Sequence, residues 1–162
     1  MRRTFTAIAT NAILLVFTSS YNSYDVSVDI NSFAPNFEIS KLGNHFKLSE
    51  TRGDYVIVNF WTSDDAEARI RNIHYDRFFK SIGNNIGFIS VNFDDSDNMF
   101  KELVKTDGLS ERSQFYEKDG AESEVYKRYR LKGGMNSYLL DKDGKILAIN
   151  PTQQQLTKYF CQ

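Results

Sequence analysis

Carboxylates are the main side chains in this sequence that could carry chemistry. Asp64, Asp65 and Glu67 follow an apolar run that ends at Trp61, and a second acidic group, DDSD at 94–97, follows a similar run. Paired carboxylates can share a proton or bind a hard cation. Acidic residues also cap helix starts, where a good N-cap contributes about 0.5–2 kcal/mol. We interpret both groups as caps, with a cation contact or catalysis as the alternatives.

The other reactive side chains are sparse and scattered. Cys161 is the single cysteine, so it can form neither an intramolecular disulfide nor a thiolate metal cluster. His45 and His74 have no histidine or cysteine partner at ligand spacing. The sequence therefore predicts no metal site and no cofactor.

The composition indicates an ordinary globular domain. Hydrophobic residues make up 41% of the 162 residues and aromatic residues 14%, enough for a packed core. Charged residues make up 25%, with a net charge of −1. Because a nucleic-acid partner requires a concentrated basic patch, we expect no nucleic-acid binding.

The first residues have the order typical of a secretory signal peptide. Arg2 and Arg3 precede an apolar stretch at 7–17, and small residues follow. We expect residues 1–20 to be a signal peptide cleaved after Ser20, and 21–31 to be a linker. The apolar stretch is short for a membrane span, so no integral span is expected after processing. The protein is thus predicted to be exported, with the periplasm as its location; an uncleaved N-terminal anchor is the alternative.

From residue 32 to 162 the pattern predicts one α/β domain. NFEIS and HFKLS flank a Gly-Asn turn and predict a β-hairpin. DYVIVNFW and IGFISVNF are apolar runs of strand length, typical of strands buried on both faces. A helix capped by Ser63 or Asp64 is expected after the first run. Its predicted buried stripe comprises Ala66, Ile70, Ile73, His74 and Phe78.

The second half continues the alternation of helices and strands. MFKELV has helical spacing, LSERSQFYEKDG suits one short strand, and AESEVYKRYRL suits a short helix. NSYLLDKDGKILAIN predicts a hairpin, and Pro151 stands near the start of a last helix. A three-layer sandwich follows, in which helices cover both faces of a mixed central sheet.

These segments, in this order, resemble the thioredoxin superfamily, in its TlpA/ResA and AhpC/TSA-like branch. The similarity rests on APNFEISKLGNHFKLSETRGDYVIVNFW, VNFDDSDNMFKELVK and SYLLDKDGKILAIN, and it extends from about Ser32 to Phe160. It implies a thioredoxin-like fold with an N-terminal β-hairpin, and a family activity of thiol–disulfide exchange.

The residues that perform that activity in the family are missing. The family segment Phe-Trp-Ala-Ser-Trp-Cys-x-x-Cys-Arg aligns with residues 60–69, which places Asp65 at the nucleophilic cysteine and Ala68 at the resolving cysteine. Met135 aligns with the cis-proline that faces the cysteines. Because exchange needs an attacking thiolate and a second thiol, the resemblance implies a chain without catalytic residues.

A binding groove is the remaining site that the resemblance implies. Thioredoxin folds bind extended peptides beside the cis-proline loop through backbone hydrogen bonds. The corresponding groove comprises Trp61, Asp64, Asp65, Gly134 and Met135. Trp61 has two interpretations, a packing residue or a contact for a peptide.

Three hypotheses for function follow. The first is an exported thioredoxin-fold protein that binds a peptide or an envelope protein without catalysis. The second is a relative of the oxidoreductases that acts through Cys161 or through a partner's thiols. The third is a purely structural domain.

Overall fold

The computed structural model describes residues 28–41, 44–83 and 87–161. It contains seven strands and four α-helices in the described part of the chain. The strands are β1 (Glu38–Lys41), β2 (Asn44–Lys47), β3 (Val56–Trp61), β4 (Phe88–Asn92), β5 (Gln114–Tyr116), β6 (Ser137–Leu140) and β7 (Ile146–Ile149). The helices are α1 (Ala66–Ser81), α2 (Asp97–Thr106), α3 (Glu124–Arg128) and α4 (Gln153–Phe160).

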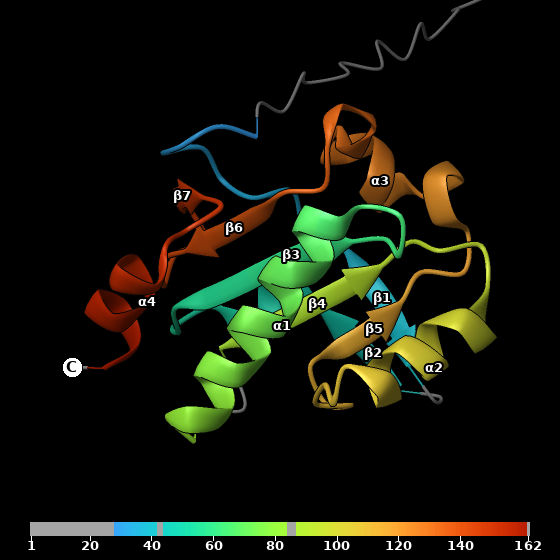
Figure 1. Cartoon of the computed structure of the whole chain (residues 1–162). Coiled ribbons are helices and arrows are strands. Elements are labelled where there is room, and N and C mark those ends of the chain that lie inside the picture. The colour runs from blue at the N-terminus through green and yellow to red at the C-terminus, as the bar shows by residue number, and fades with distance from the viewer. Residues whose placement is uncertain (1–27, 42–43, 84–86, 162) are drawn as a thin grey trace, which may run out of the picture.

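A five-stranded mixed sheet forms the centre, in the order β5-β4-β3-β6-β7 (Figure 1). β3, β4 and β5 are parallel, whereas β6 and β7 are antiparallel additions. Every residue of β3 and β4 is buried, as expected for strands covered on both faces. The hairpin β1–β2 forms a separate two-stranded sheet. The predicted α/β class, the mixed sheet and the N-terminal hairpin are thus confirmed.

The two faces of the sheet are covered by different elements. α1 and α4 cover one face, where Tyr75, Phe79 and Leu156 pack around Ile57 (Figure 1). The other face carries an aromatic cluster in which the Phe60 ring of β3 meets Phe37, Tyr129 and Tyr138. These rings come from the segment before β1, the end of α3 and β6. The three-layer arrangement predicted from the sequence is therefore present.

The edge formed by β7 is covered by the segment that precedes β1. The Asn31 N–H donates to the Ile146 carbonyl (2.8 Å), and the Ala34 N–H donates to the Gly144 carbonyl (3.0 Å). Phe33 forms an isolated antiparallel bridge with Lys145. These contacts hold residues 31–34 against the edge of the central sheet. The signal peptide predicted at 1–20 lies outside the described residues, and so does most of the linker at 21–31.

The buried face of α1 differs from the predicted stripe. Ile70 is 52% exposed, and Ala66 and His74 are also exposed. Phe78 of that stripe is buried and Ile73 packs against the core, but the other buried residues, Ala68, Asn72, Tyr75, Asp76 and Phe79, lie outside it. The prediction was wrong for Ala66, Ile70 and His74, because apolar periodicity cannot show that Asn72 and Asp76 find hydrogen-bond partners inside the molecule.

Those partners belong to a row of polar side chains across the sheet, which we call the polar row. It comprises Ser137, Asn59, Ser90 and Gln114, in register on β6, β3, β4 and β5. Ser137 Oγ donates to Asn59 Oδ1 (2.7 Å), and Asn59 Nδ2 donates to Ser90 Oγ (3.0 Å). Asn72 of α1 covers the row, accepting from Ser90 Oγ (2.7 Å) and exchanging hydrogen bonds with Gln114 (both 3.1 Å). The row thereby sets the rotation of α1 over the sheet.

Among the residues that the structure describes, no helix is both long enough and apolar enough to cross a bilayer.

Candidate functional site

Asp65 is the N-cap of α1. Its Oδ1 accepts a hydrogen bond from the Ala68 backbone N–H (2.9 Å). The N-cap predicted at Ser63 or Asp64 is therefore wrong by one residue, and Asp64 is exposed to solvent. Capping of the helix start, the role predicted for the acidic group at 64–67, is performed by Asp65.

Ala68 lies in the core rather than at the surface. Its exposure is 0%, and it belongs to the same hydrophobic cluster as Trp61 and Met135. Trp61 is also fully buried, with its ring 6.3 Å from that of Phe100 in α2. Its indole Nε1 has no hydrogen-bond partner among the described residues. Packing, the first of the two interpretations of Trp61, matches this burial.

The segment from Gly134 to Asn136 lies beside the first turns of α1. Met135 is 8% exposed, and no peptide bond in the described residues is cis. The Asn136 carbonyl accepts from the Phe60 N–H (3.1 Å), and the Met135 carbonyl accepts from the guanidinium of Arg71. Gly134, with φ of 138°, stays exposed. The Met135 carbonyl, at the residue that the resemblance aligns with the family's cis-proline, is thus occupied by the protein's own Arg71 side chain.

The second acidic group also serves local structure. Asp94 is buried; its Oδ1 accepts from the Ser63 N–H (2.8 Å) and its Oδ2 from Asn92 Nδ2 (2.9 Å). Ser96 is the N-cap of α2. Together these contacts tie the loop before α1 to the loop after β4. No group of three or more His, Cys, Asp or Glu side chains suited to a metal ion occurs in the described part of the chain.

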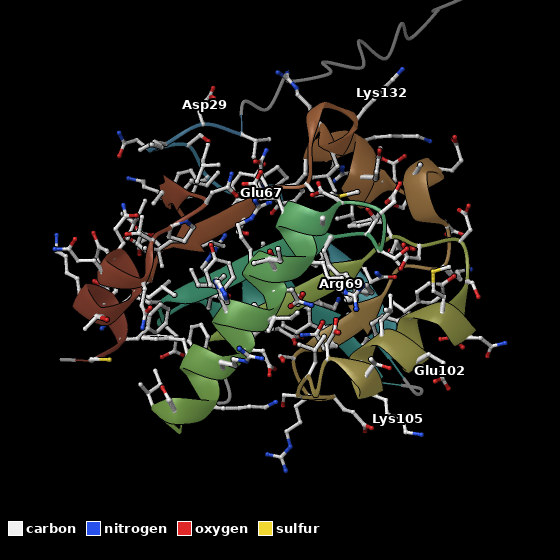
Figure 2. The ribbon with its side chains drawn as sticks, in the orientation of Figure 1. Asp29, Glu67, Arg69, Glu102, Lys105 and Lys132 are labelled. Carbon is white, nitrogen blue, oxygen red and sulfur yellow. The ribbon has the colours of Figure 1, made fainter. Side chains whose placement is uncertain are left out.

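Arg69 links α1 to the end of α2. Its Nε and Nη2 donate to the two carboxylate oxygens of Asp107, at 2.8 and 2.7 Å. The hydrogen bond to Asp107 raises the pKa of Arg69 above its ordinary value. Figure 2 shows Glu67 at the N-terminal end of α1 and Arg69 on the flank turned toward β5 and α2. Arg69 thus forms a structural link between the start of α1 and the end of α2.

The histidines and the cysteine are dispersed, as the sequence predicted. His45 Nδ1 lies 3.1 Å from Ser40 Oγ in the hairpin, whereas His74 is exposed on α1. Cys161 is exposed at the C-terminal end of α4. The neighbouring Phe160 packs on Phe79 near the last turn of α1, with ring centroids 4.8 Å apart. At roughly 1.5 Å per residue, that end of α1 lies about 20 Å from Asp65.

A cleft along α1 was missed by the sequence reasoning. It has a volume of 520 Å³ and lies between α1 and the segment that joins β7 to α4. Its lining includes Glu67, Arg71 and Arg77 from α1, with Asn150 and Thr152 from the opposite wall. The cleft is lined by residues from 67–81 and from 150–156. These two segments are far apart in the sequence and share no motif, so the sequence alone could not predict the cleft.

Taken together, the sheet order, the helix after β3 and the loop at Met135 define a thioredoxin-like protein. Residues 30–149 match the AhpC/TSA family, and the chain belongs to that family. Asp65 and Ala68, which the sequence resemblance aligns with the two cysteines of the family, offer one capping carboxylate and one buried methyl group.

Named relatives and solved structures agree with this assignment. The chain is 27% identical over 161 residues to the thiol-disulfide oxidoreductase ResA of Bacillus cereus, covering 94% of this chain and 89% of the relative. A thioredoxin-like protein of Parabacteroides distasonis superposes with a TM-score of 0.70 at 32% identity, covering 83% of this chain and 96% of the other. The C-terminal domain of a thiol-disulfide oxidoreductase from Bacteroides thetaiotaomicron gives 0.68 at 28% identity, with coverage of 80% and 92%.

Proposed function

We propose that this protein is an exported, thioredoxin-fold binding or accessory protein of the cell envelope that does not exchange disulfides. Its partner would be a peptide or an envelope protein, bound on the surface around Asp64, Asp65 and Gly134, with Trp61 and Met135 supporting that surface from beneath. The periplasm is the proposed location, on the basis of the N-terminal sequence.

One observation supports the absence of exchange most strongly. The Asp65 carboxylate caps α1 through the Ala68 N–H, and Ala68 is buried. The N-terminus of a helix favours an anion, so a carboxylate suits this position as a thiolate would. A carboxylate, however, can neither attack a disulfide nor hold two electrons in a sulfur–sulfur bond. The fold is therefore proposed to serve recognition.

The route through Cys161 is less favoured. Cys161 is an exposed thiol about 20 Å along α1 from Asp65, and as the single cysteine of the sequence it has no second thiol in the chain to resolve a mixed disulfide that it formed. Cys161 could exchange disulfides with a partner's thiols only as a single attacking cysteine, and the partner would then have to supply the resolving thiol. A purely structural role is the other alternative. The hydrogen bond from Arg71 to the Met135 carbonyl supports this alternative, because that carbonyl is then not free to accept a hydrogen bond from a bound peptide.

The proposal is tested by assaying reduction of insulin disulfides with dithiothreitol as the electron source. We expect the protein and its Cys161→Ser variant to give the rate of dithiothreitol alone. A rate above that background, equal in both proteins, would refute the proposal. A rate lost only in Cys161→Ser would instead establish the route through Cys161.

A further inference from the structure

The cleft between α1 and α4 has an apolar floor. Tyr75, Phe78 and Leu156 form it, and the Tyr75 hydroxyl donates to the Pro151 carbonyl (3.0 Å), which fixes the opposite wall. Glu67, at the N-terminal end of α1 (Figure 2), is the lining residue nearest to Asp65 in the sequence. From there the lining continues along α1 as far as Ser81, away from the former redox position.

The rim of this cleft carries two arginines and a histidine. Arg71, His74 and Arg77 follow one another on α1 and all line it. Glu67 is the single carboxylate in the lining, and its Oε1 is already paired with Arg71 Nη1 (2.7 Å). Arg77 and His74 have no ion pair or side-chain hydrogen bond with any of the described residues. Two exposed donors are therefore available to an anion from outside.

The opposite wall of the cleft also contributes a positive electrostatic potential. Thr152 and Gln153, the cap and first residue of α4, line the cleft. The positive end of the α4 dipole therefore faces the same space as the two arginines. Guanidinium groups bind carboxylates with two parallel hydrogen bonds, a geometry that lysine cannot offer.

We propose that this cleft binds a small amphipathic carboxylate, with its anionic head against Arg77 and His74 and its apolar body on Tyr75, Phe78 and Leu156. The volume of 520 Å³ suits such a ligand, since small-molecule sites span about 300–1,000 Å³. The cleft begins beside the surface at Asp65, but the proposed contacts for the ligand, at 74–78, lie farther along α1. It would exist whether or not the protein exchanges disulfides.

Octanoate is the probe, and octan-1-ol, which has the same chain without the charge, is its control. Titration followed by amide NMR shifts should give saturable changes at 71–78 and 150–156 with octanoate. We expect Arg77→Gln to weaken octanoate binding by roughly two- to fivefold, as for an exposed ion pair. Arg112→Gln, an identical change at an exposed arginine outside the cleft, should leave it unaltered.

Three results would overturn the proposal. One is equal binding of octanol and octanoate, since the arginines and the histidine of the rim would then contribute nothing. Another is equal octanoate affinity in Arg77→Gln and the unmodified protein. The third is that octanoate causes no saturable shifts at the residues of the cleft. Saturable shifts found only on the surface around α2 count as this third result. None of these results bears on insulin reduction, so this proposal and the proposed function fail separately.

Discussion

The guanidinium of Arg71 on α1 donates a hydrogen bond to the main-chain carbonyl of Met135, the residue that the sequence resemblance aligns with the family's cis-proline. The same guanidinium forms an ion pair with Glu67. One side chain thus joins the first turns of α1 to the loop before β6 and fixes that loop in place.

Removing this contact should loosen the loop. In Arg71→Met the stem is retained while the Met135 carbonyl loses its donor, so we expect a loss of about 1–3 kcal/mol in the free energy of unfolding. Urea unfolding measures that loss, and amide exchange at 131–136 should accelerate. Glu67→Gln is the matched control. Because Glu67 is 85% exposed, its change should stay within about 0.5 kcal/mol. Equal effects of the two substitutions would contradict this role for Arg71.

The N-cap at Asp65 should be worth a measurable part of the stability. Asp65→Ala removes the acceptor for the Ala68 N–H, and we expect it to cost about 0.5–2 kcal/mol. Asp65→Asn keeps an acceptor and should recover most of that loss. Asp64→Ala, at the exposed neighbour, should be nearly neutral in the same thermal unfolding experiment. If Asp64→Ala were the more harmful change, the cap would be misassigned.

The polar row should respond strongly to the loss of one member. Asn59→Ala leaves Ser137 Oγ and Ser90 Oγ without their shared partner in a fully buried place, and we expect it to cost about 2–3 kcal/mol. Asn98→Ala, an exposed asparagine in α2, is the control. Chemical denaturation of both variants provides the test. A cost below about 0.5 kcal/mol at Asn59 would mean that the row contributes no stability.

Stability should fall at alkaline pH because of Tyr129. Its hydroxyl donates to the Pro35 carbonyl (2.8 Å), and burial, followed by Tyr138, raises the pKa of Tyr129 above its ordinary value of 10.0. A raised pKa in the folded state gives a contribution that is complete below about pH 10 and is lost at higher pH.

We therefore expect the urea midpoint to drop between about pH 9 and about pH 11, and to drop less steeply in Tyr129→Phe. Tyr75 and Tyr138, whose pKa values burial also raises, should leave a residual slope in that variant. An unchanged slope would show that Tyr129 does not titrate differently in the folded and unfolded states.

Much of the architecture could be predicted from the sequence because apolar runs report burial directly. VIVNFW and FISVN became the central strands β3 and β4, and Asp141 to Gly144 became the turn of the last hairpin. The face of α1 could not be predicted, since Asn72 appears as a surface residue until its partners Ser90 and Gln114 are placed beneath it.

The site was predictable in one respect and hidden in another. The absence of paired cysteines and the capping role of acids at the start of α1 follow from residue type and position. The Arg71 contact and the cleft depend on which segments meet in three dimensions. Arg71 and Met135 are 64 residues apart, and nothing in the local sequence of either indicates the other.

The central claim is that this thioredoxin-like fold does not exchange disulfides because it lacks a pair of thiols at 65 and 68, so the direct measurement is to supply them. In Asp65→Cys/Ala68→Cys, made on the Cys161→Ser background, we expect oxidation to form one intramolecular disulfide, seen as a mass loss of about 2 Da. Insulin reduction should then rise above the dithiothreitol background that the single Cys161→Ser variant gives. Turnover by Cys161→Ser at the level of the restored variant would contradict the account.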